Sequence, residues 1–366
     1  MEIGIIGLPK SGKTTVFNAL ARGNADTDAY SSPSLTPNVG VVKVPDSRLA
    51  TLTELAKPER TVPAEVTYID IAAPAHGFGK RDGAGGQFLN YLSKVDALAL
   101  VVRVFEDDSM PHVEGSVDSE RDVGLMNLEL SFSDLDIIDR RLERIRASLK
   151  AAKQQVREQG MREEALLTRI KSALENDVPI RDQDLSVQES KEIEGFQFLT
   201  AKPMLLLLNV SEEQLPESES LEEHFCGFCL SPYVGVAVLC GQLEMELAQL
   251  DDAEAEEFRA GLGLNESGLD RMIRLSYGLL GLISFFTIGS DEVRAWTVRR
   301  GTMVQKAAGK VHSDLERGFI RAEVIGHDDL VQCGSLAEAR KRGLLRLEGK
   351  TYIVQDGDVV TVLFNV

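Results

Sequence analysis

The stretch from residue 7 to residue 14, Gly-Leu-Pro-Lys-Ser-Gly-Lys-Thr, constrains the fold more than any other part of the chain. It matches G-x-x-x-x-G-K-[ST], follows the β-branched run Ile3–Ile6 and precedes apolar residues at helical spacing. A glycine-rich loop between a strand and a helix points backbone N–H groups at a phosphate, and the helix N-terminus adds its unpaired donors. The motif therefore predicts a P-loop nucleotide-binding domain of the α/β class.

The loop also supplies the candidate chemistry. We expect Lys13 to reach the β- and γ-phosphate oxygens as the catalytic residue and the Thr14 hydroxyl to ligate Mg²⁺. Asp70, at the end of an apolar strand, is the candidate carboxylate near that ion. Hydroxyl residues before the strand Val39–Val44, among them Ser34, are further candidates for the magnesium shell. The predicted phosphate-binding residues are Pro9, Lys10, Ser11, Gly12, Lys13, Thr14 and Thr15.

A second polar motif follows another buried strand. The apolar run Leu205–Leu208 ends at Asn209-Val210-Ser211-Glu212, at the sheet edge where ligands bind. Regulatory GTPases carry Asn-Lys-x-Asp there, and the Asp carboxylate accepts two hydrogen bonds from guanine. Val210 replaces the Lys, and Glu212 is one methylene longer than Asp, so the pattern indicates lost guanine selectivity first and adenine preference second. ATP is therefore the expected nucleotide, with GTP as the alternative.

Charge and composition exclude several classes of protein. The net charge of −18 argues against a protein that coats nucleic acid with its whole surface. From residue 281 onward, 12 Lys and Arg stand against 11 Asp and Glu, so this segment would tolerate an RNA backbone best. Four scattered cysteines predict a reducing cytoplasm. The chain opens without a signal-peptide pattern, and no apolar run is long enough to span a bilayer.

Two patterns divide the rest of the chain. Apolar residues over Leu135–Leu149 step by three and four, which predicts a heptad seam that Gly160 interrupts and a second helix resumes at 167–174. So short a seam favours an antiparallel hairpin arm over a dimer zipper. The C-terminal segment predicts a small β-grasp module, with Asp356-Gly357 as a hairpin turn. Its predicted strands are 285–288, 293–298, 319–325, 352–354 and 359–364, and its predicted helices lie near 307–317 and 335–342.

Together these residues resemble the YchF subfamily of Obg-like ATPases, in the translation-factor class of P-loop NTPases. The resemblance runs nearly end to end, through GLPKSGKTT, PNVGVVKVPDSRL, DIAA, HVEGSVDSERD, NVSE and EVRAWTV…GFIRAEVI…LEGKTYIVQDGDVV. It implies a P-loop NTPase G domain with an inserted α-helical coiled-coil arm and a C-terminal β-grasp (TGS) domain. In that subfamily N-x-x-E replaces N-K-x-D, and ATP is preferred over GTP. Hydrolysis of the γ-phosphate in translation or stress regulation is the implied activity.

The resemblance also implies the domain limits, the site and the partners. The G domain would comprise 1–130 and 201–280, the coiled-coil insertion 131–200 and the TGS domain 281–366. Ser34 would join Thr14 and Asp70 at Mg²⁺. The TGS domain and the arm would contact the ribosome or ribosomal RNA, and we expect a cytoplasmic monomer with no membrane partner. The implied base-contacting residues are Asn209, Val210, Ser211, Glu212, Cys240, Gly241 and Gln242.

The chain departs from the subfamily at three positions. Lys10 replaces an Asn, Ala73 replaces the D-x-x-G glycine, and His76 replaces a Lys. Ala73 and the neighbouring Pro74 restrict the backbone of a loop that must move. Nucleotide binding is still expected. A GTPase of the same fold and a nucleotide-sensing ribosome binder with little hydrolysis are the rival hypotheses.

Overall fold

In the computed structural model, residues 1–21, 37–71, 84–149, 153–264 and 266–365 are described. The chain forms two compact units, Met1–Gly40 with Thr67–Met272 and Val41–Val66 with Ile273–Val366. Nothing in the sequence pattern indicates that an N-terminal segment groups with the C-terminal residues. No helix in the described ranges is both long and apolar enough to cross a membrane.

The first unit contains a six-stranded sheet in the order β2-β4-β1-β5-β6-β7. Strands β4, β1, β5, β6 and β7 pair in parallel, so their carboxyl ends meet at one edge of the sheet. Gly7, Asp70, Asn209 and Cys240 lie at or directly after these ends. The bounds are β1 (Glu2–Ile6), β2 (Asn38–Lys43), β4 (Glu65–Asp70), β5 (Ala97–Arg103), β6 (Met204–Asn209) and β7 (Val234–Leu239).

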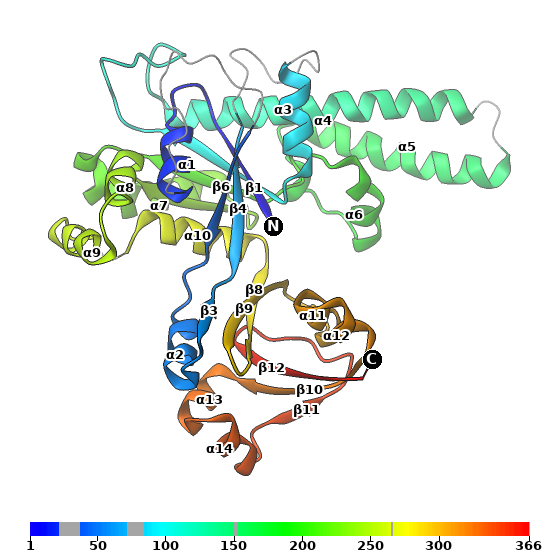
Figure 1. The fold of residues 1–366 in the computed structure, drawn as a ribbon. Coiled ribbons are helices and arrows are strands. Elements are labelled where there is room, and N and C mark those ends of the chain that lie inside the picture. Colours follow the sequence, from blue (N-terminus) through cyan, green and yellow to red (C-terminus); the bar gives the residue numbers. More distant parts are fainter. Residues whose placement is uncertain (22–36, 72–83, 150–152, 265, 366) are drawn as a thin grey trace. The chain divides into compact units, whose positions relative to one another are not determined.

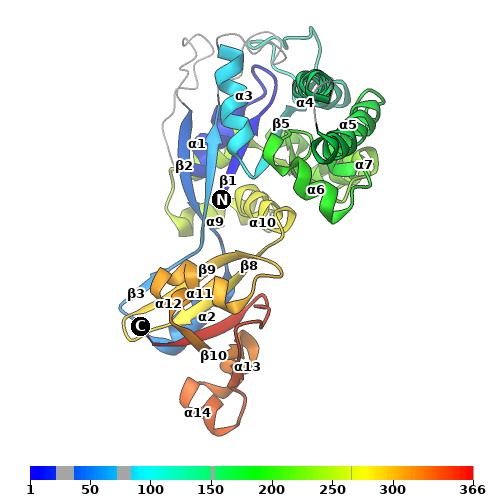
Figure 2. The ribbon, with the colours of Figure 1, turned by 90° about the vertical axis from the view of Figure 1, so that its right-hand side faces the viewer.

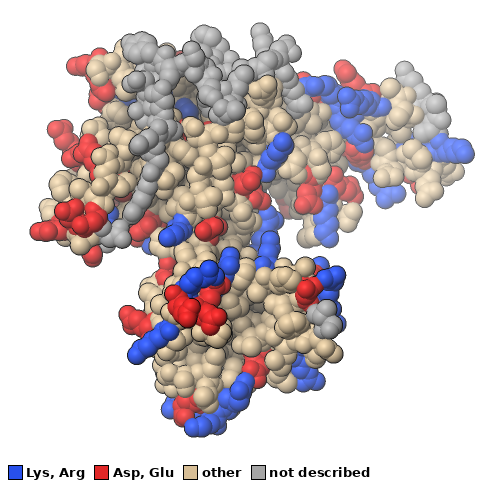
Figure 3. Space-filling view, viewed as in Figure 1, with Lys and Arg blue, Asp and Glu red and all other residues tan. Residues whose placement is uncertain are grey.

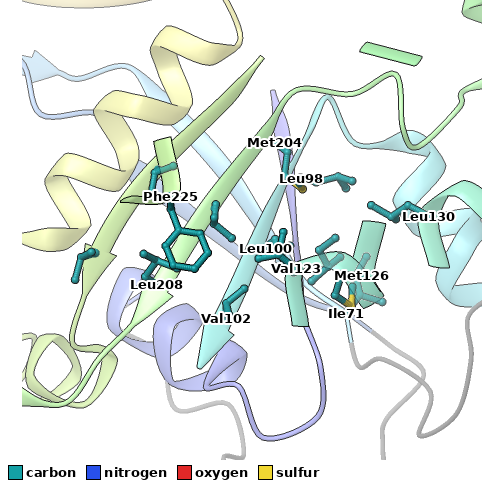
Figure 4. Close-up of a cluster of buried hydrophobic side chains, with 14 of the residues drawn as sticks. Ile71, Leu98, Leu100, Val102, Val123, Met126, Leu130, Met204, Leu208 and Phe225 are labelled. Carbon is teal, nitrogen blue, oxygen red and sulfur yellow. The ribbon is translucent and has the colours of Figure 1, made fainter. Parts of the chain in front are cut away.

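Helices α4 and α7 cover one face of this sheet. There Val102 of β5 and Leu208 of β6 lie in one buried cluster with Val123 and Met126 of α4 and Phe225 of α7 (Figure 4). Every residue of β5 is buried, as expected for a parallel strand covered on both faces. The helices of the unit are α1 (Lys13–Ala21), α3 (Ala84–Lys94), α4 (Ser119–Leu149), α5 (Gln154–Leu174), α6 (Val187–Ile193), α7 (Ser218–Cys229), α8 (Gly241–Leu247), α9 (Asp252–Gly261) and the beginning of α10 (Gly268–Leu279), with 3-10 turns η1 (Ile180–Asp182), η2 (Glu194–Phe196) and η3 (Glu212–Glu217).

The arm is a hairpin of α4 and α5, which lie side by side in both views (Figures 1 and 2). Ile138 and Leu142 of α4 pack with Ile170 of α5 along the predicted seam. Ion pairs cross between the helices, for example between Arg146 and Glu164 at 2.7 Å. Such exposed pairs contribute little stability, but they are consistent with one register of the hairpin.

The predicted break of the arm at Gly160 is wrong. Helix α4 ends at Leu149, and Gly160 lies inside α5. A Cβ atom on residue 160 would lie 2.9 Å from Leu149 Cδ2. The glycine therefore permits close approach of the two helices and does not end one of them.

The second unit contains a sheet in the order β11-β10-β12-β8-β9-β3. Phe285 packs on one face of this sheet with Val304 and Ala308 of α11. The next residue, Phe286, points to the other face, where the Arg48 guanidinium of α2 lies 5.4 Å from its ring centre. The bounds are β3 (Arg60–Val62), β8 (Leu282–Ile288), β9 (Glu292–Arg299), β10 (Phe319–Gly326), β11 (Arg346–Glu348), β12 (Asp358–Phe364), α2 (Ser47–Ala56), α11 (Val304–Val311), α12 (Ser313–Arg317), α13 (His327–Cys333) and α14 (Leu336–Lys341).

Segment Val41–Val66 is bound to this sheet in two ways. Strand β3 pairs in parallel with β9, with Arg60 opposite Glu292. Arg48 also contacts Asp356, with 3.0 Å between Nη1 and Oδ2. These long-range contacts explain why an N-terminal segment belongs to a C-terminal unit.

Two details of the predicted β-grasp module are wrong. Residues 352–354 do not form a strand, because only Ile353 makes a bridge, to Met303. Asp356-Gly357 therefore does not join two strands of a hairpin. The Asp356 carboxylate instead accepts a hydrogen bond from Ser284 N at 2.9 Å. Strand β11 and helix α13 were not predicted from the sequence.

Candidate functional site

Two glycines shape the loop between β1 and α1. Gly7 has φ +152° and Gly12 has φ +93°, conformations that side-chain-bearing residues rarely adopt. A Cβ on Gly7 would lie 2.3 Å from Val101 O, and one on Gly12 would lie 2.2 Å from Asn209 Nδ2. The loop therefore requires glycine at both positions of the motif.

The Lys13 side chain folds back over this loop. Its Nζ donates hydrogen bonds to Gly7 O at 3.0 Å and Leu8 O at 2.7 Å. Burial lowers the pKa of Lys13 to about 8, and the Asp70 carboxylate counteracts part of that shift. Below that pKa, Lys13 carries an ammonium group, which lies beside the N-terminus of α1. A phosphate there would form charge-assisted hydrogen bonds with it.

The other residues of the predicted phosphate set occupy one loop and the first turn of α1. Ser11 is buried, and its Oγ has no hydrogen-bond partner among the described residues. Lys10 is exposed and donates to Pro111 O at 3.4 Å. Pro9 and Thr15 are partly buried. These residues are consecutive in the sequence, so they lie in one segment by necessity, and their contact with phosphate stays a prediction.

Thr14 and Asp70 also come together. Thr14 Oγ1 donates to Asp70 Oδ2 at 3.0 Å, although 56 residues separate them. Burial raises the pKa of Asp70, against the opposing effects of Thr14, Lys13 and Asn38. Asp70 Oδ1 is buried without a hydrogen-bond partner among the described residues. A hydroxyl and a carboxylate with a free oxygen are ligands that suit Mg²⁺, so this pair fits the ion. Ser34, Ala73, Pro74 and His76 lie outside the described residues.

Asn209 connects the P-loop to the loop that follows β7. Its Nδ2 donates to Ser11 O at 3.0 Å, and its Oδ1 accepts from Gly241 N at 2.9 Å. The side chain is only 4% exposed. This amide therefore holds two loops at a fixed separation, which is a positioning role.

The remaining predicted base contacts lie around that amide. Val210 is buried in the core, and Ser211 forms a capping box with Gln214 at the start of η3. Glu212 is exposed at the beginning of η3. Burial raises the pKa of the Cys240 thiol, and the nearby Glu212 carboxylate raises it further. Of the loop after β7, Cys240 and Gly241 are buried and Gln242 is exposed.

A buried histidine lies next to the phosphate loop and was not predicted from the sequence. His112 Nε2 lies 2.9 Å from Asp122 Oδ2, and the side chains of the two residues are 4% and 5% exposed. Arg121 also pairs with Asp122. The contact between Lys10 and Pro111 joins this segment to the loop. In the sequence this histidine opens the segment HVEGSVDSERD. That segment has no helical or strand periodicity, so no pattern in it indicates that the histidine side chain is buried.

The pKa of Lys13 predicts how nucleotide affinity depends on pH. Phosphate oxygens bind the ammonium form, and an amine with a pKa of about 8 loses that form as the pH rises through 8. The affinity for a non-hydrolysable ATP analogue should then be constant between pH 6.5 and 7.5 and should fall up to about tenfold per pH unit above 8. Titrations by calorimetry from pH 6.5 to 9.5 measure this, and Lys13→Ala should give weak binding that is flat with pH. An equal decline in both proteins would assign the pH dependence to another group.

Comparison with known proteins gives matches over the whole chain. A family model described as a 50S ribosome-binding GTPase matches residues 2–130, and the YchF-GTPase_C model, described as a protein of unknown function, matches residues 282–365. The chain is 41% identical to the ribosome-binding ATPase YchF of Bacillus subtilis over 368 residues, covering 100% of both proteins. It is 36% identical to Obg-like ATPase 1 of Caenorhabditis elegans, covering 100% of this chain and 92% of that protein. The solved structure of the Schizosaccharomyces pombe YchF GTPase superposes with a TM-score of 0.85 at 30% identity, covering 99% of this chain and 97% of that one.

Proposed function

This chain belongs to the YchF family, and from that premise we propose that it hydrolyses ATP in preference to GTP, with Mg²⁺, in contact with the ribosome. It is a P-loop NTPase with a G domain and a YchF-type C-terminal domain. The observation that carries the proposal is the joint placement of Lys13, Thr14 and Asp70 at one sheet edge. Relatives such as the ribosome-binding ATPase YchF of Bacillus subtilis support the activity and the partner.

The proposed reaction transfers the γ-phosphoryl group to water. A water oxygen attacks the γ-phosphorus, the bond to the β–γ bridging oxygen breaks, and the products are ADP and inorganic phosphate. Lys13 holds the β- and γ-phosphate oxygens through its ammonium group, beside the N–H groups of the loop. Thr14 and Asp70 would hold Mg²⁺, which, when bound, neutralises charge that develops on those oxygens. Asn209 keeps the loop that binds phosphate aligned with the loop at Gly241.

We propose Glu212 as the residue that selects the base. It is exposed at the first position of η3, three residues after the strand that ends at Asn209. An Asp at this position would shorten the side chain to the length that lets a carboxylate accept both guanine hydrogen bonds. Glu212→Asp should therefore shift the affinity ratio towards GTP by about tenfold, since one buried hydrogen bond contributes about 1.5 kcal/mol. Titration with non-hydrolysable ATP and GTP analogues measures the ratio.

The neighbouring residue provides a matched control for this prediction. Glu213 is also exposed in η3, and Glu213→Asp makes the same chemical change one position further on. This variant should keep the wild-type ratio. Equal shifts in both variants would mean that η3 responds to any shortening, and no shift in Glu212→Asp would remove Glu212 from base selection.

We further propose the domain roles. The G domain comprises 1–130 and 201–280, the coiled-coil arm 131–200 and the TGS domain 281–366, and the arm and TGS domain contact the ribosome or its RNA. Of the residues of this G domain, Val41–Val66 and 273–280 belong to the second compact unit. The protein would act as a monomer in the cytoplasm, where ribosomes are located. Phosphate release measured with and without ribosomes tests this scheme. Stimulation of hydrolysis by ribosomes supports it, whereas ribosome binding without hydrolysis would favour a nucleotide-sensing binder.

A further inference from the structure

Helix α9 exposes apolar side chains on the surface of the first unit. Phe258 is 51% exposed and Leu262, one turn later, is 44% exposed. Leu262 N donates to Phe258 O at 3.2 Å, so the two residues lie one above the other on the same side of the helix. Only Ala255 of α9 is buried among its described side chains. Among the residues that the structure describes, most of the surface of this helix therefore has no partner.

The same helix carries a dense negative charge. From its N-cap to the residue after its end, 251–262, it contains five Asp and Glu against one Arg. In Figure 3, which has the viewpoint of Figure 1, acidic side chains gather where α9 lies. In the part of the chain that the structure describes, neither Glu256 nor Glu257 forms an ion pair. The arm differs, because acidic residues such as Glu164 pair there with arginines.

Charge decides which partner could cover this surface. RNA phosphates and anionic lipid headgroups would be repelled by unpaired carboxylates. A second copy of this chain in a two-fold contact would place the same acidic helix opposite itself, which is also repulsive. A basic protein segment would be attracted by both the charge and the apolar side chains of α9. Its Lys and Arg would face the carboxylates, and an apolar side chain would cover Phe258 and Leu262.

We propose that α9 is a docking surface for a basic protein segment that carries apolar side chains, and that this segment belongs to a ribosomal protein. The identification of the ribosome as its source rests on the proposed function. Proteins that lie against RNA are rich in Lys and Arg because they neutralise phosphates, so a ribosome presents such segments beside its RNA. The acidic α9 would contact these proteins. The segment from residue 281 onward, whose positive and negative charges nearly balance, would contact the RNA.

The test uses the full-length protein and purified ribosomes, with an ATP analogue that is not hydrolysed. One double variant, Phe258→Ala with Leu262→Ala, removes the apolar contact, and a second, Glu256→Lys with Glu257→Lys, reverses two charges. The matched control is Glu219→Lys with Glu223→Lys, which makes the same change in net charge at exposed positions of α7. Melting temperatures of all three variants are compared with that of wild type to check that they fold. The altered side chains are exposed, so we expect little loss of stability. If one α9 variant does not fold, the other still tests the surface. Binding is measured by co-sedimentation with intact ribosomes and with ribosomal RNA freed of protein.

We expect both α9 variants to bind intact ribosomes at least tenfold more weakly than wild type, and the α7 control to bind within twofold. Wild type should also bind protein-free RNA at least tenfold more weakly than intact ribosomes. Wild-type binding by the α9 variants would overturn the inference while leaving the proposed function intact. Tighter binding of RNA by Glu256→Lys with Glu257→Lys, without loss on ribosomes, would assign the surface to RNA and overturn it as well. Failure of wild type to bind intact ribosomes would instead overturn the proposed ribosome contact, and the inference with it.

Discussion

Lys13→Ala is expected to lower the rate of ATP hydrolysis by about a hundredfold or more, because it removes the positive charge nearest to the transferred phosphate. Lys13 lies at the N-terminus of α1, and its Nζ is close enough to the loop to donate to Gly7 O and Leu8 O. Of the two lysines in the motif, Lys10 is exposed and Lys13 is partly buried. The loss should appear in the rate at saturating ATP, since a charge that stabilises the transition state raises kcat.

Steady-state phosphate release at saturating ATP measures this effect. Lys94→Ala is the control, because it removes an exposed lysine at the end of α3 in the same unit. The control should keep the wild-type rate. Hydrolysis by Lys13→Ala at the wild-type rate would show that the P-loop is not the site of the reaction.

Asn209→Asp is expected to destabilise the protein by about 2–4 kcal/mol and to weaken ATP-analogue binding at least tenfold. The substituted carboxylate can still accept from Gly241 N, but it offers no hydrogen to Ser11 O, which lies 3.0 Å from the present Nδ2. The side chain is 4% exposed, so a negative charge would be buried beside a carbonyl oxygen. Both loops should lose their alignment together.

Urea denaturation gives the free energy of unfolding, and calorimetric titration gives the affinity. Asn176→Asp is the matched control, because Asn176 Nδ2 also donates to a main-chain carbonyl, Ser172 O at 2.7 Å, but on an exposed surface of the arm. That change should cost no more than about 0.5 kcal/mol and leave affinity unchanged. If both variants lose equal stability, the buried bridge is not the cause.

The parts of this protein that follow from short, local patterns could be predicted from its sequence. The P-loop motif specifies a strand, a loop and a helix within 21 residues, and β1 and α1 lie there. The G-domain fold, the hairpin arm and the C-terminal module also carry local periodicity, and family comparison agrees with them. Asp70 and Asn209 could be placed at one sheet edge, because parallel strands share that edge.

The parts that depend on contacts distant in the sequence could not be predicted. Asn209 reaches Ser11 across 198 residues, and no spacing rule indicates which way its amide points. The pairing of β3 with β9 depends on a three-residue strand, too short for a recognisable pattern. Gly160 looks like a helix end in the sequence, because glycine has the same signature whether it stops a helix or permits close packing.

The most direct test of the central claim compares phosphate release from ATP and from GTP by the wild-type protein, at equal concentrations and with Mg²⁺. We expect a higher kcat/KM for ATP, by about tenfold, because Glu212 stands where a guanine-selective Asp would be required. A higher kcat/KM for GTP would contradict the assignment of Glu212 and make the protein a GTPase of the same fold. Release from neither nucleotide, with or without ribosomes, would contradict the proposal that this P-loop hydrolyses its nucleotide.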